Sequence, residues 1–340
     1  MTGHFPAAVT AAAARIAPFV ARTPLLEAAT LNELVSRALG LRALRVFVKA
    51  ENLQHTGAFK FRGATNKLLL LSPEQKDRGV VAFSSGNFAQ ALALASHNLG
   101  VRCTIVSPHD APQLKLQRTR SYGATVVTTI PAPGENREVC AAARARAIAD
   151  ETGATLLHPF DDWDVIHGQG SIALEIFEQA GCRLNSLVVP CGGGGMLAGC
   201  SLATSLVSPQ TRLFAVEPEA YNDHCLSFNS SDRCRMSLPS GSQLKSICDA
   251  LQANAPGELT WSVNKTSLSG ACSMSDSEAV AAMKIAFTEL KLVLEPSAAL
   301  GLAALMNGKV GGLADGDAVA VVASGGNISI EEYVKLMSHS

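Results

Sequence analysis

Short apolar runs alternate with longer helical stretches along most of this chain, and this alternation restricts the fold more than any other feature of the sequence. The helical stretches that separate several of the runs are residues 90–99, 137–151 and 277–289. Apolar runs of this length are typical of strands buried on both faces, and strands that alternate with helices form parallel sheets covered by helices on both sides. The sequence therefore predicts an α/β fold. The runs are residues 46–50, 79–83, 103–107, 125–127, 187–189 and 318–322.

A run of four glycines follows one of these predicted strands. The apolar residues 187–191 lead into the glycines, and residues 196–200, which are again mostly apolar, follow them. A flexible linker would not have such flanks, whereas a strand, a glycine turn and a helix N-terminus together form an anion site. We therefore expect the glycine run to bind a phosphate group.

Lys60 lies in a segment of unusual composition, residues 58–63 (AFKFRG). A solvated lysine is the usual interpretation of a lysine in a soluble protein, but here Phe59 and Phe61 flank it and Gly57 and Gly63 bracket the segment. We expect a tight turn that leads into a helix over residues 64–71. A lysine beside apolar groups loses its proton more easily, and its amine can hold an aldehyde cofactor as a Schiff base. Together with the phosphate site, Lys60 indicates pyridoxal phosphate.

Two further polar loops follow predicted strands. Residues 84–87 (SSGN) come after the strand that ends at Phe83, and Ser324 comes after the last strand, in a glycine turn. The alternatives are a helix cap for the first loop and an ordinary turn for the second. Ligands of open α/β sheets bind at the carboxyl ends of the strands, so both loops are candidates for a binding site.

Composition excludes several classes of protein. At 340 residues with 47% hydrophobic content, the chain can bury one large core or two smaller ones. A net charge of -1 argues against nucleic-acid binding. No segment approaches 18 consecutive apolar residues, and residues 1–19 lack the pattern of a signal peptide, so we expect a cytoplasmic location and no membrane partner. The nine cysteines contain no C-x-x-C pair, which favours reduced thiols.

With these motifs in place, the chain resembles the fold-type II pyridoxal phosphate enzymes of the serine racemase and serine/threonine dehydratase family. The resemblance runs from Thr23-Pro24-Leu25 to residues 324–327 and includes residues 158–162 (HPFDD), 168–170 (GQG) and 217–218 (EP). It implies a fold like that of the tryptophan synthase beta subunit, with two open, twisted, mostly parallel sheets. It also implies a small substrate-loop domain over residues 81–158, a large cofactor domain from residues 1–80 and 159–340, and a homodimer.

The resemblance also implies a role for each motif residue. Lys60 and Ser85 would be catalytic, with Ser85 facing the substrate from the side opposite the lysine. Ser84, Ser85, Asn87 and Arg137 would bind a small amino-acid substrate, although Arg137 is almost as well explained as a solvated helix residue. The residues that would hold pyridoxal 5'-phosphate are Phe59, Lys60, Asn87, Gly192, Gly193, Gly194, Gly195, Met196 and Ser324.

The expected reaction begins with removal of the alpha proton by Lys60 from a beta-hydroxy amino acid such as L-serine or L-threonine. Loss of the beta-hydroxyl then gives a keto acid and ammonia, whereas a proton delivered by Ser85 to the opposite face gives the D-amino acid. Because Ser324 offers a hydroxyl rather than a carboxylate to the ring nitrogen, the ring is a weaker electron sink, and this favours elimination over transamination. The family also contains 3-hydroxyaspartate dehydratases and aspartate racemases, which stay open as alternatives.

An acidic turn follows the predicted strand at residues 213–216. Carboxylates on such a turn are hard ligands for Mg²⁺ or Ca²⁺, although most acidic turns bind nothing. The resemblance implies a site for Mg²⁺, or for Ca²⁺ or Mn²⁺, formed by Glu217, the backbone carbonyl of Tyr221 and Asp223.

Several residues depart from the family pattern. Phe88 stands where histidine is common, and Ala28, Ala29 and His55 replace residues of the nucleotide site of animal serine racemase, so we do not expect activation by ATP. Residues 160–162 and 248–251 are closer to the microbial dehydratases. Two other classes stay open. A nicotinamide oxidoreductase would also use a glycine turn, but the run lacks the G-x-G-x-x-G spacing. A catalytically silent cofactor-binding protein would not need Lys60, Ser85 and Ser324 together.

Overall fold

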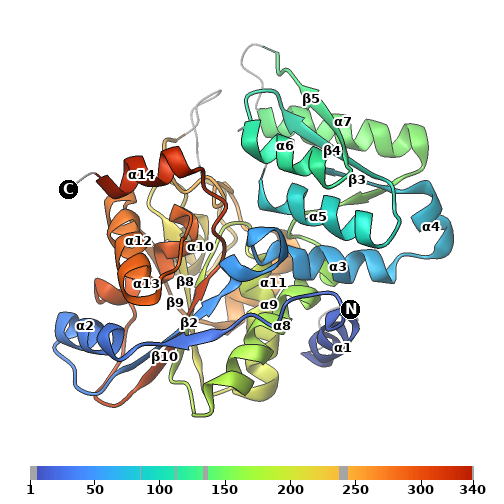
Figure 1. Cartoon of the computed structure of the whole chain (residues 1–340). Helices are drawn as coiled ribbons and strands as arrows, with labels where there is room; N and C mark the ends of the chain where they lie inside the picture. The colour runs from blue at the N-terminus through green and yellow to red at the C-terminus, as the bar shows by residue number, and fades with distance from the viewer. Residues whose placement is uncertain (1–5, 85, 112, 133–136, 237–243, 339–340) are drawn as a thin grey trace.

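Two sheets organise the chain, and they lie side by side (Figure 1). The computed structural model describes residues 6–84, 86–111, 113–132, 137–236 and 244–338. The larger sheet has the strand order β1-β2-β10-β7-β8-β9, and the smaller has the order β5-β4-β3-β6. Among the strands of the described residues, only β1 runs antiparallel to its neighbour, so the predicted α/β fold with mostly parallel sheets is confirmed. The strands are β1 (Leu25–Glu27), β2 (Arg45–Ala50), β3 (Val80–Phe83), β4 (Cys103–Pro108), β5 (Thr125–Thr129), β6 (Thr155–Leu157), β7 (Ser186–Pro190), β8 (Arg212–Pro218), β9 (Leu268–Met274) and β10 (Ala318–Ala323).

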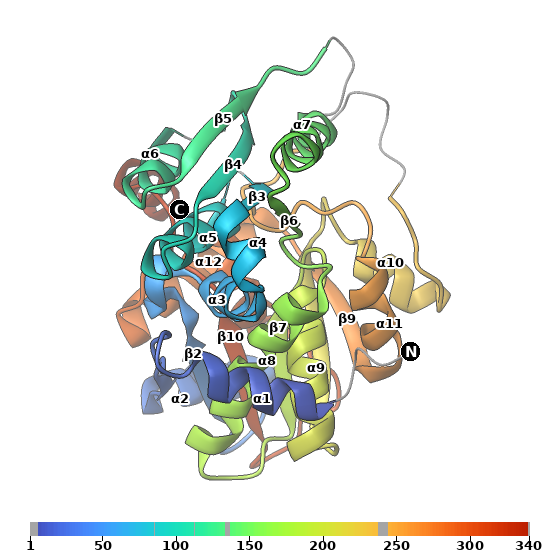
Figure 2. The same ribbon diagram turned by 90° about the vertical axis from the view of Figure 1, so that its right-hand side faces the viewer.

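Helices cover both faces of the larger sheet, as the two views show (Figures 1 and 2). Among the described residues, no helix has both the length and the apolar character needed to cross a membrane. The α-helices are α1 (Pro6–Ile16), α2 (Ala29–Leu39), α3 (Lys60–Leu70), α4 (Pro73–Arg78), α5 (Asn87–Asn98), α6 (Gln113–Ser121), α7 (Arg137–Thr152), α8 (Trp163–Ala180), α9 (Gly195–Val207), α10 (Asp223–Ser230), α11 (Glu258–Ser267), α12 (Asp276–Leu290), α13 (Pro296–Met306) and α14 (Ile330–Ser338), with short 3-10 turns η1 (Glu51–Leu53) and η2 (His55–Gly57).

The central strand β10 shows how the sequence divides the core of the larger sheet. Val319 and Val321 belong to the apolar cluster that includes α12 and α13, whereas Ala320 and Val322 belong to the cluster that includes α8 and α9. Successive side chains of a strand point to opposite faces. A continuous apolar run is therefore required here, because both faces of this strand are buried.

The smaller sheet is formed by residues between Val80 and Leu157. Its strands thus fall close to the expected domain limits at residues 81 and 158, and α5, α6 and α7 accompany it (Figure 1). The division of the chain into two domains stays a prediction.

The start of α3 differs from the prediction. The helix begins at Lys60 and not at Ala64, because Phe59 already has helical backbone angles and its carbonyl accepts a hydrogen bond from the backbone N–H of Arg62. Gly63 does not end a turn. A β-carbon added there would lie 2.7 Å from the carbonyl oxygen of Val165 in α8, so this glycine allows the two helices to pack closely.

A buried ionic cluster fixes this first turn of α3. Arg62 is fully buried and donates hydrogen bonds to Glu51 and Glu175, at 2.8 Å and 2.6 Å respectively. Lys49, also fully buried, donates to the same Glu175 carboxylate at 2.6 Å. A buried charge is tolerated only when it is paired and hydrogen-bonded. The cluster therefore holds the end of β2, the start of α3 and the middle of α8 in one arrangement.

Candidate functional site

Three of the predicted loops meet at one edge of the larger sheet. The glycine run follows β7, and Ser324 follows β10, the strand that pairs with β7 in parallel. Lys60 joins this edge through its neighbour, since the backbone N–H of Phe59 donates a 3.1 Å hydrogen bond to the carbonyl oxygen of Ser324. The carboxyl ends of parallel strands are the usual ligand-binding edge of an α/β sheet, and the prediction that these segments share one site agrees with this geometry.

Lys60 is half-buried and surrounded by aromatic rings. Its Nζ lies 5.1 Å, 5.9 Å and 6.0 Å from the ring centroids of Phe59, Phe88 and Phe160. It donates a hydrogen bond of 2.8 Å to the backbone carbonyl of Pro159, and no charge of a described carboxylate offsets the effect of burial on its pKa. Burial lowers the pKa of Lys60 to about 8. An amine of this kind is partly neutral near physiological pH and can act as a nucleophile or a base.

The glycine run leaves no space for side chains. A β-carbon at Gly193 would overlap the ring of Phe160, and one at Gly195 would lie 2.9 Å from the backbone of the same residue. Gly194 has a left-handed backbone, with φ of 91°, and a β-carbon there would lie 2.7 Å from Nε2 of His224. The run leads directly into α9, whose second residue, Met196, is buried. Backbone N–H groups at such a turn and helix N-terminus can hold a phosphate group.

Phe160 connects the lysine to the glycine run. Its ring is one of the three near Lys60 Nζ, and its ring and backbone contact Gly193 and Gly195. The lysine amine and the glycine turn are therefore separated by about one side chain. This spacing fits pyridoxal phosphate, whose aldehyde and phosphate groups are attached to one ring.

A network of amides and one carboxyl group joins the start of α5 to the segment after Ser324. Asn87, at the start of α5, donates a hydrogen bond of 2.7 Å to Oε1 of Glu295 and accepts one of 2.9 Å from Asn327. Glu295 is buried, and its other oxygen, Oε2, has no hydrogen-bond partner among the described residues. Desolvation raises the pKa of Glu295 to about 7, while the charge of Lys115 opposes this shift.

The predicted substrate-binding residues stay a prediction. Ser85 lies outside the described residues. Ser84 is half-buried, and its Oγ accepts a hydrogen bond of 3.3 Å from the backbone N–H of Gly86. Arg137, at the start of α7, forms an ion pair of 2.6 Å with Asp110. The hydrogen bond of Ser84 and the ion pair of Arg137 both lie within the segment that carries the smaller sheet, and the charge of Arg137 also acts on Tyr221, after β8.

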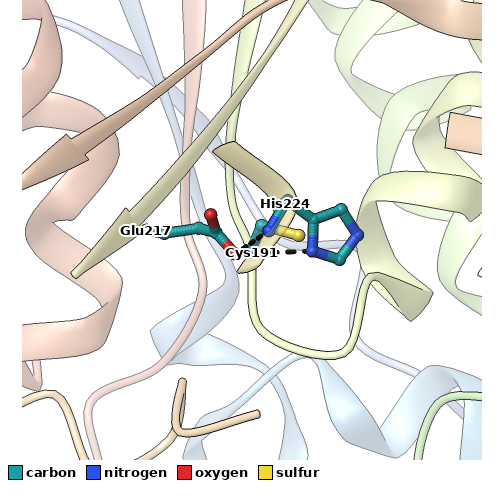
Figure 3. Close-up of side chains that lie close together, drawn as sticks. All are labelled: Cys191, Glu217 and His224. Carbon is teal, nitrogen blue, oxygen red and sulfur yellow. Dashed lines mark hydrogen bonds and ion pairs between the residues drawn. The ribbon is translucent and has the colours of Figure 1, made fainter. Parts of the chain in front are cut away.

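The acidic segment from the end of β8 to the start of α10 forms a buried cluster (Figure 3). The carboxylate of Glu217 accepts hydrogen bonds from the backbone N–H groups of His224 and Cys225, at 3.0 Å and 2.8 Å. Asp223 is buried, and neither of its carboxylate oxygens has a hydrogen-bond partner among the described residues. Tyr221 is also buried, and its hydroxyl donates to the carbonyl of Leu244. Two buried carboxylates, one of them unsatisfied, are a donor set that fits a divalent cation.

Sequence reasoning missed several residues of this region. Phe160 was recognised only as part of a motif, and neither Glu295 nor the pair Cys191 and His224 was expected to take part. The side chains of Cys191 and His224 lie beside Glu217, and the three potential ligand atoms are within 4.8 Å of one another. One signal was available for Glu295, which is the single acidic residue between the apolar residues 292–294 and the apolar helix α13.

Comparison with known proteins agrees with this geometry. Residues 16–325 match the family model described as pyridoxal-phosphate dependent enzyme. The chain is 39% identical over 324 residues to an L-threo-3-hydroxyaspartate ammonia-lyase of Saccharomyces cerevisiae, with 95% of this chain and 93% of the relative covered. It is 36% identical over 330 residues to a catabolic L-threonine dehydratase of Staphylococcus aureus, with 96% and 90% covered. The structure of maize serine racemase superposes with a TM-score of 0.87 at 32% identity and covers 98% of this chain and 97% of its own.

Proposed function

Because the chain belongs to the pyridoxal-phosphate dependent enzyme family, we propose that it is an ammonia-lyase for small beta-hydroxy amino acids. The substrate loses its alpha proton and its beta-hydroxyl, and the product is a keto acid with release of ammonia. The observation that carries this proposal is the environment of Lys60, an amine held among three aromatic rings and with a pKa lowered to about 8.

Each group of residues in the site would have its own role in this reaction. Pyridoxal phosphate supplies an electron sink for the charge left on the alpha carbon. The backbone of Gly192, Gly193, Gly194 and Gly195 would hold the phosphate, and Asn87 and Ser324 would hold the two sides of the ring. Lys60 in its neutral form accepts the alpha proton, and the surrounding phenyl rings exclude water from the amine. The hydroxyl of Ser324 cannot keep a ring nitrogen charged as a carboxylate would, which favours elimination over transamination.

Among the possible substrates, L-threo-3-hydroxyaspartate is the first to test. The yeast relative named for this substrate is 39% identical to the chain, compared with 36% for the threonine dehydratase. L-serine and L-threonine, the substrates expected from the sequence, are the next candidates. Formation of a D-amino acid would additionally require a proton donor on the face opposite Lys60, the role predicted for Ser85.

The proposal includes a bound cation, a cytoplasmic location and a homodimer. A divalent cation, Mg²⁺ by the family resemblance, would bind at Glu217, Asp223 and the carbonyl of Tyr221, and the two buried carboxylates support this location. The cation would stabilise the turn after β8 and would take no part in the proton transfer. A cytoplasmic homodimer is the expected form of the enzyme.

The test is turnover by the purified, cofactor-loaded protein. L-threo-3-hydroxyaspartate, L-serine and L-threonine are supplied in turn, and ammonia, keto acid and D-enantiomer are measured together. We expect ammonia and keto acid in equal amounts, and a decrease of about 10²- to 10⁴-fold in Lys60→Ala, the usual contribution of a general base. Lys265→Ala, which changes an exposed lysine on α11, is the matched control. Absence of turnover with all three substrates would disprove the proposal, and D-enantiomer without keto acid would replace it by a racemase.

A further inference from the structure

The acidic cluster under the glycine run contains two donors that a magnesium site does not need. Cys191 ends the segment that leads into Gly192, and His224 is the second residue of α10. Both are buried, with exposed fractions of 1% and 0%, and Figure 3 shows the side chain of Cys191 beside the carboxylate of Glu217 and the ring of His224. Thiolate and imidazole are ligands that favour Zn²⁺ over Mg²⁺.

The spacing of the donor atoms suits a tetrahedral ion. Nδ1 of His224 lies 3.4 Å from Oε1 of Glu217 and 3.4 Å from Oδ2 of Asp223. Zinc bonds of about 2.0–2.3 Å place neighbouring ligands about 3.2–3.8 Å apart. The thiol of Cys191, the nearest oxygen of Glu217 and the nitrogen of His224 are all within 4.8 Å of one another. Rotation of these side chains that moves the ligand atoms by about 1 Å therefore brings the sulfur within bonding distance of the same ion.

Several of the atoms that would bind the ion make no hydrogen bond within the described part of the chain. Nδ1 of His224 and both carboxylate oxygens of Asp223 are buried without a hydrogen-bond partner among the described residues. If a protonated His224 only neutralised the two carboxylates, its ring would donate at an ordinary distance of about 2.7–3.2 Å, which is shorter than the 3.4 Å found for both contacts. Buried polar groups without partners require an explanation, and an ion is one of the usual ones.

We propose that Cys191, Glu217, Asp223 and His224 form a zinc site that supports the phosphate-binding glycine run from below. Cys191 is covalently joined to Gly192, and His224 lies directly under Gly194, where a β-carbon would be 2.7 Å from its ring. The ion therefore holds both ends of the turn that faces the cofactor phosphate. This proposal rests on the proposed function only for the location of the cation. It assigns Zn²⁺ in place of Mg²⁺ and adds Cys191 and His224 as ligands.

The test uses Zn²⁺ added to metal-free protein, with metal content and X-ray absorption at the zinc edge as readouts. We expect one zinc per chain and a sulfur neighbour at about 2.3 Å. Cys191→Ala should lose the sulfur signal and bind Zn²⁺ more than about tenfold more weakly, since loss of even an outer-shell partner costs that much. Cys200→Ala, which removes an equally buried thiol from α9, should keep both properties.

Other outcomes overturn the proposal. Zinc surrounded only by oxygen and nitrogen, failure to bind zinc, or equal affinity in Cys191→Ala would each remove Cys191 from the site. The wild-type absorption spectrum decides the question even if Cys191→Ala does not fold. Keto acid production is measured on the same samples, so that the two proposals fail separately. Zinc bound through sulfur in an inactive protein would disprove only the proposed function. Turnover by a protein that binds no zinc through sulfur would disprove only the zinc site.

Discussion

Nζ of Lys60 donates a hydrogen bond to the backbone carbonyl of Pro159, at a distance of 2.8 Å. The acceptor belongs to the segment that also carries Phe160, the residue packed against the glycine run. The lysine is therefore oriented toward the expected phosphate site by a neutral backbone group, and not by a carboxylate. A neutral acceptor does not raise the pKa of the amine as a carboxylate would, so burial lowers it without opposition.

Attachment of pyridoxal phosphate to the cofactor-free protein should follow the titration of Lys60. The neutral amine is the reactive form, and with a pKa of about 8 its fraction rises about tenfold per pH unit below pH 8 and then levels off. The rate of covalent attachment, measured by borohydride trapping and mass spectrometry, should show this plateau. An exposed lysine such as Lys265 should show labelling that still rises above about pH 9.5. A rate at Lys60 that rises in the same way would contradict the lowered pKa.

Gly193→Ala should weaken the binding of pyridoxal phosphate. The added β-carbon overlaps the ring of Phe160, so either the ring or the turn must move. Overpacking of this kind costs about 1–3 kcal/mol, which corresponds to roughly a 5- to 150-fold increase in Kd if the strain is relieved when the cofactor leaves. Gly311→Ala is the control, because no atom lies within 4 Å of its added β-carbon. Cofactor titration followed by visible absorbance gives both constants, and equal values for the wild type and Gly193→Ala would refute the tight fit.

The sequence was sufficient to predict those parts of the fold that depend on local pattern. The strands at residues 46–50, 187–189 and 318–322 were recognised because a strand buried on both faces is mostly apolar, and β2, β7 and β10 contain them. The start of α3 was predicted incorrectly because Gly63 was interpreted from its neighbours in sequence. Its actual constraint is the backbone of Val165, about a hundred residues away in the chain.

The same limit applies to the candidate site. The lysine segment and the glycine run have distinctive local compositions, but Glu295 and His224 are ordinary residues in sequence. Their position becomes evident only when Asn87 is found to bond to Glu295, and when Gly194 is found above the ring of His224. Contacts between segments that are distant in the chain place these residues in the site, and such contacts cannot be predicted from one sequence.

Arg62→Met should strongly destabilise the protein. Arg62 is fully buried, and its removal leaves the carboxylates of Glu51 and Glu175 without their main partner. Breaking a buried ion pair from one side costs about 3–5 kcal/mol. Arg37→Met, which breaks the exposed pair with Glu33, should cost less than about 1 kcal/mol. Urea unfolding measures both free energies, and a loss in Arg62→Met as small as that in Arg37→Met would show that the cluster does not fix the start of α3.

Glu295→Gln should stabilise the protein above neutral pH and leave its stability unchanged in acid. Since burial raises the pKa of Glu295 from 4.5 to about 7, the folded state binds more protons than the unfolded state between these values. The stability of the wild type must therefore fall as pH rises through this window, by up to about 3.5 kcal/mol at about 1.4 kcal/mol per pKa unit. Glutamine carries no charge and can still accept the hydrogen bond from Asn87. Urea unfolding of both proteins at about pH 5 and pH 8 tests the sign. A variant less stable than the wild type at the higher pH would mean that Glu295 is held as a stabilised carboxylate.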